Sequence, residues 1–273
     1  MYYLGIDIGS LSCDAVLLDG AGSVAASAVV PTGARNREAI ARVTEEVFRK
    51  MGIDRKELAG VVSTGYGRDR VEERLAAVTE ITCHARGMRA LHPATRVLID
   101  IGGKDSKCIC LSAEGAVSNF AMNDKCAAGT GRFLEAMARA LGVDIDDLGS
   151  LDEGAAGTHA ISSMCTVFAE SEVVSLIADG TPVPEIVRGL HRAIASRTVS
   201  LLKRTIPEPD GLAVAMSGGV ARNGGVVRAI AEALGRPVYV PPLPDTVGAL
   251  GAALIAKDRC ARGAAAVSPA GRA

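Results

Sequence analysis

Two aspartates, Asp7 and Asp100, each occupy the second position of the tetrapeptide Ile-Asp-Ile-Gly, at residues 6–9 and 99–102. In both places a hydrophobic run ends in the aspartate and the chain then turns on glycine. Glycine leaves backbone N–H groups free to approach phosphate oxygens, while the carboxylate can face a metal ion. This pattern therefore favours the binding of a nucleotide with its metal.

The similarity between the two segments continues for about fifteen residues at a constant offset of 93 positions. It pairs Leu18 with Leu111, Gly22 with Gly115 and Val24 with Val117. Each copy predicts a strand, a glycine turn, a strand, a second turn and a third strand. We expect a duplicated α/β protein with a nucleotide between two related lobes, although hydrophobic strands that end in glycine also recur by chance in α/β proteins.

Hydrophobic periodicity predicts the elements that must position these turns. Helices are expected at 38–51, 80–91, 129–141, 169–178, 184–202, 225–234 and 247–256, and further strands at 58–63, 96–101, 106–111, 115–121, 212–216 and 238–240. The first lobe is predicted to span residues 1–92 and to be completed by a C-terminal helix at about 247–258. The second lobe spans 93–246, and residues 259–273 form a loose tail.

A third glycine-rich element, Ser217-Gly218-Gly219, lies between an expected strand and helix. Alone it is weak evidence, because glycine ends many strands and helices without touching a ligand. Together with the two duplicated turns it resembles the actin-like ATPase superfamily of sugar kinases, Hsp70 chaperones and actin. The resemblance implies a duplicated ribonuclease H-like fold of two lobes that binds ATP or ADP with Mg²⁺. No Walker A sequence competes with this interpretation.

Composition excludes several other classes. The 273 residues carry a net charge of −1, contain no Trp and have only 3% aromatic residues, so neither a phosphate-tracking stripe nor a base-stacking platform is expected. No apolar span is long enough for a membrane helix, and no signal peptide is evident. We expect a cytoplasmic protein that binds neither nucleic acid nor membranes.

Seven cysteines, an odd number, argue against a set of structural disulfides. Cys126 opens Cys-Ala-Ala-Gly-Thr-Gly and Cys165 precedes Thr-Val-Phe-Ala-Glu, so both are expected near helix N-termini, where thiolates are stabilised. A two-fold dimer would supply four such thiolates for one [4Fe–4S] cluster. Alternatively, Cys126 and Cys165 pack as small hydrophobic side chains. For Cys108 and Cys110, which share one face of an expected strand, core packing fits better than metal binding.

The chain is similar to the ATP-dependent activators of 2-hydroxyacyl-CoA dehydratases across roughly residues 3–256. The similarity is carried by Ser-Thr-Gly-Tyr-Gly-Arg at 63–68, Glu-Ile-Thr-Cys-His-Ala-Arg-Gly at 80–87, Asp-Ile-Gly-Gly at 100–103, and the segments 126–131, 165–172 and 217–223. The resemblance implies a homodimer with one bridging [4Fe–4S] cluster, in which ATP drives a low-potential electron into an acyl-CoA dehydratase or a related iron–sulfur reductase. Reduced ferredoxin or flavodoxin would be the donor.

The same family contains ATPase subunits of benzoyl-CoA reductase and reductases of double-cubane cluster proteins, which are alternative functions. A small-molecule kinase and a filament-forming or chaperone ATPase of the superfamily also remain open. In the cluster-bearing alternatives the matching motifs assign the cluster-ligand role to Cys126 and Cys165.

The predicted catalytic residues are Asp7, Asp100 and Lys104, which would organise metal, water and phosphate. The predicted nucleotide-binding residues are Gly9, Ser10, Ser12, Gly102, Gly103, Gly129, Gly131, Ser217, Gly218, Gly219 and Asn223. Three positions depart from the family pattern: Lys104 and Asp245 stand where Gln is common, and Cys13-Asp14 stands where Ser-Lys often follows the first turn.

Overall fold

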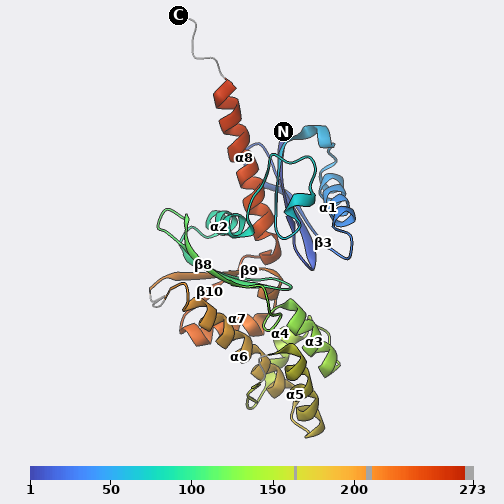
Figure 1. Cartoon of the computed structure of the whole chain (residues 1–273), viewed down its shortest axis with the longest axis vertical. Coiled ribbons are helices and arrows are strands. Elements are labelled where there is room, and N and C mark those ends of the chain that lie inside the picture. Colours follow the sequence, from blue (N-terminus) through green and yellow to red (C-terminus); the bar gives the residue numbers. More distant parts are fainter. Residues whose placement is uncertain (163–164, 207–210, 268–273) are drawn as a thin grey trace, which may run out of the picture. The chain divides into compact units, whose positions relative to one another are not determined.

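The computed structural model describes the chain except for residues 163–164, 207–210 and 268–273. The chain divides into two compact units, which we treat separately. Unit 1 combines Met1–Pro93 with the C-terminal segment from Asp245, and unit 2 comprises Ala94–Pro244 (Figure 1). Each unit contains one mixed five-stranded sheet.

The sheet of unit 1 has the strand order β3-β2-β1-β4-β5. Its strands are β1 (Tyr2–Ile8), β2 (Ser12–Leu18), β3 (Val24–Pro31), β4 (Leu58–Thr64) and β5 (Ala76–Ala77). Its helices are α1 (Asn36–Met51), α2 (Glu80–Leu91) and α8 (Val247–Val267), with short 3₁₀ turns at Arg55–Glu57 and Arg68–Arg70 and a further one, Pro244–Thr246, ahead of α8.

Alternation along β1 decides which residues reach which helices. Leu4 and Ile6 pack with the apolar face of α1, whereas Tyr3 packs with α8 on the opposite face. Gly5 shares the α8 face, and a Cβ there would lie 2.0 Å from the Ala249 carbonyl oxygen. The missing side chain lets α8 lie directly on the strand, and Asp7, two residues further on, points to the same side.

The sheet of unit 2 has the order β10-β9-β6-β7-β8. Its strands are β6 (Thr95–Ile101), β7 (Ser106–Leu111), β8 (Val117–Asn123), β9 (Ala213–Ser217) and β10 (Val238–Tyr239). Its helices are α3 (Gly131–Leu141), α4 (Leu148–Leu151), α5 (Thr166–Ala178), α6 (Val183–Leu202) and α7 (Gly224–Leu234), with 3₁₀ turns η3 (Asp152–Gly154) and η4 (Gly219–Arg222).

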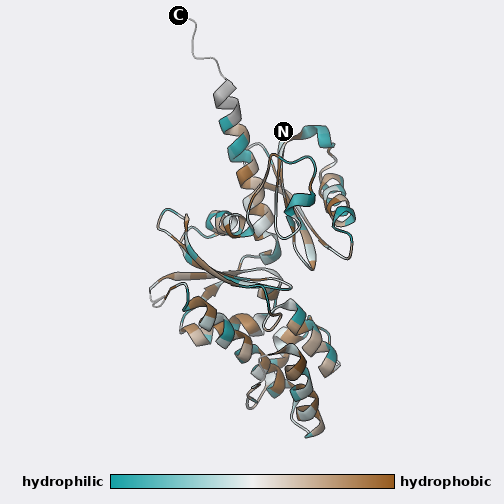
Figure 2. Cartoon of the chain, in the orientation of Figure 1, coloured by the Kyte–Doolittle hydropathy of each residue, from teal (hydrophilic) through white to brown (hydrophobic). Residues whose placement is uncertain are grey.

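The two sheets have the same topology. In each, the first strand pairs antiparallel with the second, the second pairs antiparallel with the third, and the first pairs parallel with the fourth. The units differ between the third and fourth strands, where unit 1 has α1 and unit 2 has α3 to α6. This larger insertion carries both Cys126 and Cys165. Its hydrophobic stretches (brown in Figure 2) pack with β6 and β9 in one buried cluster.

Two helix boundaries differ by three residues or more from the sequence-based expectations. Helix α5 begins at Thr166 rather than 169, so that Cys165 is its N-cap residue. Helix α8 continues to Val267, whereas a loose tail was expected from Arg259. Three alanines at 264–266 explain the extension, since alanine has the highest helix propensity. None of the helices that the structure describes is long and apolar enough to cross a membrane.

Candidate functional site

The Asp7 carboxylate lies at the end of β1 in unit 1 and is buried. The turn after it closes with a hydrogen bond from the Gly9 N–H to the Ser12 carbonyl oxygen at 2.9 Å. Ser10, at the tip of this turn, is exposed. A buried carboxylate followed by an open glycine turn is the arrangement that the repeat predicts.

Three groups enclose Asp7. His84, on α2, places its Nε2 atom 3.4 Å from Asp7 Oδ2. A Cβ on Gly248 would lie 2.0 Å from Oδ2, and one on Gly65 would lie 2.3 Å from Oδ1, so both glycines are required by the position of the carboxylate. Because Gly248 is in the first turn of α8, the positive end of that helix favours the negative charge.

Asp14 lies directly opposite Asp7 in the antiparallel pairing of β1 and β2. Its Oδ2 atom accepts a hydrogen bond from the Ser12 hydroxyl at 3.0 Å, whereas its Oδ1 atom is buried and has no hydrogen-bond partner among the described residues. Burial, reinforced by the charges of Asp7 and Asp245, raises the pKa of Asp14 well above its usual range. Two acidic side chains therefore share the strand end in unit 1.

Asp100 is the corresponding carboxylate of unit 2, and it is fully paired. The Ser217 hydroxyl donates to its Oδ1 atom at 2.9 Å, and Lys107 Nζ lies 3.2 Å from its Oδ2 atom. Lys107 also bonds Asp105 Oδ1 at 2.9 Å. Since Lys107 and Asp100 are both buried, this lysine neutralises the carboxylate inside the unit.

The glycine turn of unit 2 is bonded to helix α3. Gly102 N–H closes the turn on the Asp105 carbonyl oxygen at 3.0 Å, as Gly9 does on Ser12 in unit 1. The carbonyl oxygens of Gly102 and Gly103 then accept from the N–H groups of Gly131 and Arg132 at 3.0 and 2.9 Å. A displacement of this turn is therefore passed to the first turn of α3.

The segment Ser217-Gly218 is the counterpart of Thr64-Gly65 in unit 1. Thr64 lies opposite Asp7 in the parallel pairing, and Ser217 lies opposite Asp100. Gly65 and Gly218 have φ angles of 84° and 86°, and a Cβ on Gly218 would lie 2.9 Å from Asp100 Oδ1. The duplication therefore extends to the fourth strand of each sheet, beyond the two turns that the offset of 93 residues pairs.

The remaining predicted nucleotide residues are dispersed over the surface and interior of unit 2. Lys104 is exposed and forms no hydrogen bond or ion pair with the other described residues. Gly129 is buried, and Gly219 is exposed at the start of η4. Asn223 caps α7, because its Oδ1 atom accepts from Val226 N–H at 3.0 Å. Contacts of these residues with a nucleotide stay predictions.

Cys126 and Cys165 are the two exposed cysteines among the seven, all of which are free. Cys165 is the N-cap of α5, and Cys126 precedes Thr130, the N-cap of α3, by four residues. Helices α3 and α5 pack against each other. By contrast, burial raises the pKa of the Cys83 and Cys108 thiols to about 12 and that of Cys13 still further.

A cation lies close to Cys126. Arg197, on α6, stacks over the ring of Phe133 at 5.5 Å from its centroid. Burial lowers the pKa of Arg197, and the negative charge of a Cys126 thiolate opposes that shift.

Comparison with known proteins shows the family to which this chain belongs. Residues 4–256 match the model of the BadF/BadG/BcrA/BcrD ATPase family. The chain belongs to this family. It is 48% identical to the activator of lactoyl-CoA dehydratase from Anaerotignum propionicum, an alignment that covers 94% of this chain and 98% of the relative. Membership confirms the predicted family and the prediction of an ATP-binding ATPase.

Solved structures of other family members confirm the predicted two-lobe, actin-like fold. The activator of 2-hydroxyisocaproyl-CoA dehydratase from Clostridium difficile, solved with bound ADPNP, has a TM-score of 0.92 and 42% identity, and the whole of both chains is covered. Component A of (R)-2-hydroxyglutaryl-CoA dehydratase from Acidaminococcus fermentans has a TM-score of 0.90 and 41% identity, with 96% of this chain and 99% of that chain covered.

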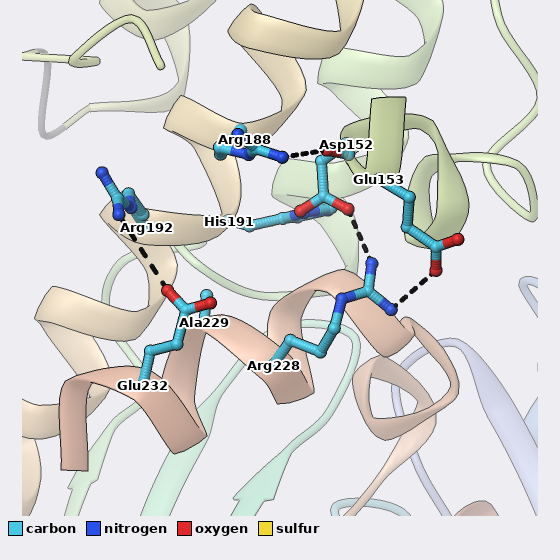
Figure 3. Close-up of a pocket in the computed structure, with 8 residues that line it drawn as sticks. All are labelled: Asp152, Glu153, Arg188, His191, Arg192, Arg228, Ala229 and Glu232. Carbon is cyan, nitrogen blue, oxygen red and sulfur yellow. Dashed lines mark hydrogen bonds and ion pairs between the residues drawn. The ribbon is translucent and has the colours of Figure 1, made fainter. Parts of the chain in front are cut away.

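Sequence reasoning missed two features of this BadF/BadG/BcrA/BcrD ATPase family member. One is Lys107, whose pairing with Asp100 could have been inferred from the hairpin register and from the repeat. The other is a buried network in unit 2, drawn in Figure 3, in which His191 Nδ1 lies 2.8 Å from Asp152 Oδ2 and Arg228 bonds Asp152 Oδ1 at 2.6 Å. No motif links these three positions in the sequence.

The pKa values of two groups in this network are shifted. Burial lowers the pKa of His191, although the Asp152 charge and hydrogen bond oppose the shift. Burial would raise the pKa of Asp152, but hydrogen bonds from His191 and Arg228 outweigh it and the pKa is lowered. His191 is therefore a neutral imidazole held by the Asp152 carboxylate. Together with Arg228, these residues connect η3, α6 and α7 in unit 2.

Proposed function

We propose that this chain is an ATP-dependent activator that delivers a low-potential electron to a 2-hydroxyacyl-CoA dehydratase or a related iron–sulfur reductase. The proposal is supported by relatives named as activators of such dehydratases that are 41 to 48% identical over more than nine-tenths of the chain. A benzoyl-CoA reductase subunit from Thauera aromatica is a more distant relative, 33% identical over 78% of the chain. We therefore favour a dehydratase as the partner.

The residues present fit Mg-ATP. Asp7 carries carboxylate oxygens of the kind that Mg²⁺ prefers, Asp100 ends the equivalent strand of unit 2, and each precedes a glycine turn. When bound, the ion supplies electrostatic stabilisation of the charge on the transferring phosphoryl group. Asp7 and Asp100 would orient this metal and the attacking water. The N–H groups of Gly9 and Gly102 close their own turns, so the N–H groups that follow them in each turn would bind phosphate oxygens. Lys104, being exposed and free of other bonds, can reach a phosphate.

The thiols fit an iron–sulfur cluster on a dimer axis. Cys126 and Cys165 are exposed in one unit, whereas burial protonates Cys13, Cys83 and Cys108. Among the described residues no three His, Cys, Asp or Glu side chains gather to hold a metal. Two thiolates from each of two chains would complete a [4Fe–4S] centre, which supplies one-electron chemistry when bound. Reduced ferredoxin or flavodoxin would be its donor.

One observation carries the coupling between these sites. The carbonyl oxygens of Gly102 and Gly103 hold the N–H groups of Gly131 and Arg132, at the start of the helix that follows Cys126. Thr130 reinforces this link, since its hydroxyl donates to the Gly103 carbonyl oxygen at 3.1 Å. A shift of the phosphate turn on ATP binding or hydrolysis therefore moves the peptide that carries a cluster ligand.

The test is anaerobic purification followed by iron and sulfide analysis of the wild type and three cysteine variants. The wild type should contain about four irons per dimer. Cys126→Ser and Cys165→Ser should each lose all of the iron, because each change removes two of the four ligands at once. Cys110→Ser, a partly exposed cysteine of the same unit, is the matched control and should keep it.

The same samples test the ATP dependence. Iron extraction by a chelator should accelerate when Mg-ATP is added to the wild type, and nucleotide binding should persist in the cluster-free variants. A colourless wild-type protein that phosphorylates a metabolite would instead identify a kinase. Iron that survives in both the Cys126→Ser and the Cys165→Ser variant would refute the ligand assignment.

A further inference from the structure

The internal repeat places opposite charges at equivalent positions of the two units. At the repeat offset of 93 residues, Asp14 corresponds to Lys107. Both lie one strand away from the repeated aspartate and in the same register, Asp14 opposite Asp7 and Lys107 opposite Asp100. Side chains of directly opposite residues lie on the same face of a sheet, with Cβ atoms about 4.5–5.5 Å apart.

In unit 2 this position completes a neutralised group. Lys107 Nζ lies 3.2 Å from Asp100 and 2.9 Å from Asp105, so one ammonium group is shared by two carboxylates. The position equivalent to Asp105 in unit 1 is Ser12, which donates to Asp14 instead. Equivalent backbone positions therefore hold a lysine between two aspartates in unit 2 and two neighbouring aspartates in unit 1.

In unit 1 the electrostatic demand of Asp14 is unmet. The side chain is 5% exposed, and the groups that act on it are Asp7, Asp245, Ser12 and His84. His84 also faces Asp7 at 3.4 Å, so one imidazole acts on both Asp7 and Asp14. The Oδ1 atom of Asp14 has no partner among the described residues. A buried carboxylate oxygen without a partner requires an explanation, and a bound ion is one.

We propose that Asp14 and Asp7 hold a divalent cation of the Mg²⁺ or Mn²⁺ class in unit 1 before any nucleotide binds. The cation takes the electrostatic place that Lys107 has in unit 2. Mg²⁺ suits the position, because it binds through one or two carboxylates and keeps several waters. The proposal deepens the proposed function and rests on it, since Asp7 is also assigned to the metal of the nucleotide.

A proton on Asp14 would not meet the same demand. A proton neutralises only one of the two directly opposite carboxyl groups, Asp14 and Asp7. A hydrated cation satisfies the free oxygen directly and offsets the charge of both aspartates.

Nucleotide-free Mn²⁺ binding tests the proposal. The full-length anaerobic protein, freed of nucleotide, is titrated with Mn²⁺, and the free ion is followed by electron paramagnetic resonance. The wild type should bind about one Mn²⁺ per chain, and Mg²⁺ should displace it. Asp14→Lys, which installs the residue of the second repeat, should weaken Mn²⁺ binding by about tenfold or more.

Two further variants locate the site and guard against misfolding. Asp14→Asn keeps the side-chain shape and should also weaken Mn²⁺ binding, so the test survives if Asp14→Lys does not fold. Asp105→Asn is the matched control in unit 2 and should leave nucleotide-free Mn²⁺ binding unchanged, because Lys107 already pairs with that carboxylate. Circular dichroism confirms that each variant is folded.

The proposal is overturned if the wild type binds no Mn²⁺ without nucleotide, or if folded Asp14→Lys and Asp14→Asn bind it as tightly as the wild type does. Equal loss in Asp105→Asn would also overturn it, since the ion would then not belong to unit 1. ATP hydrolysis and iron content are measured on the same samples. If ATP hydrolysis and iron content are intact but nucleotide-free Mn²⁺ binding is absent, this inference alone is refuted. If Mn²⁺ binds but the protein neither hydrolyses ATP nor contains iron, the proposed function is refuted.

Discussion

Replacing Lys107 with methionine would isolate the contribution of the buried ion pair in unit 2. Methionine keeps the length of the stem and removes the ammonium group. The Lys107 and Asp100 side chains are 4% and 3% exposed, so solvent screening reduces their interaction little. Removing one partner of such a buried pair leaves an uncompensated charge and should cost about 3–5 kcal/mol of unfolding free energy. A loss of this size is a large part of the unfolding free energy of a folded protein, which is typically about 5–15 kcal/mol.

A double-mutant cycle separates the pair from the packing of the lysine stem. Asp100→Asn combined with Lys107→Met removes both charges, and it should recover most of the lost stability, because a buried pair replaced as a whole is often neutral. Urea unfolding followed by circular dichroism gives the free energies. Hydrogen exchange at the amides of β6 and β7 supplies a local reading in case the two units unfold separately.

The reasoning would be refuted by a loss of less than about 1 kcal/mol in Lys107→Met, which is the range of an exposed pair. It would also fail if the double variant were as unstable as Lys107→Met alone. Asp105, whose side chain is 27% exposed, provides the internal comparison. Asp105→Asn should cost about 1 kcal/mol or less, because water can replace the partner that Lys107 loses.

Two further predictions concern the Asp7 site and the buried network of unit 2. Gly248→Ala places a methyl group on the Asp7 carboxylate and should strongly reduce Mg-ATP hydrolysis, whereas Gly20→Ala, where a Cβ meets no atom closer than 3.8 Å, should leave it unchanged; equal rates in both would contradict the geometry. Because the lowered pKa values of His191 and Asp152 make the unfolded state bind more protons, their contribution to stability is present above about pH 6.5 for the histidine and is lost as pH falls. Unfolding free energies measured between pH 7 and pH 5 should therefore fall less steeply in His191→Gln than in the wild type, and parallel curves would exclude this origin.

The regular elements were largely predictable from periodicity. The helix at Glu80–Leu91 and the strand at Ser106–Leu111 have the expected bounds, because each combines a clear apolar pattern with polar or glycine residues at its ends. The helix after 247 was expected to stop early, since its apolar pattern fades although alanine continues to favour helix. Local pattern thus locates an element better than it locates its end.

The site was predictable only where residues repeat or precede a recognisable turn. Asp7 and Asp100 could be found because the duplication marks them twice. Asp14 could be compared with Lys107 by the same offset, yet the burial of both groups appears only once the strands are paired. Asp152 and His191 meet through the packing of η3 on α6, which no local pattern specifies.

The bonds from Gly131 and Arg132 to the carbonyl oxygens of Gly102 and Gly103 join backbone to backbone. Such contacts do not depend on which side chains the four positions carry, so they survive substitutions that preserve the path of the chain. Under the proposed function, homologous proteins could therefore diverge at Lys104, and with it in their rate of ATP turnover, while keeping the backbone connection to the helix that follows Cys126. The rate of ATP turnover and the backbone connection between the Gly102 turn and α3 could thus evolve as separate traits of one enzyme.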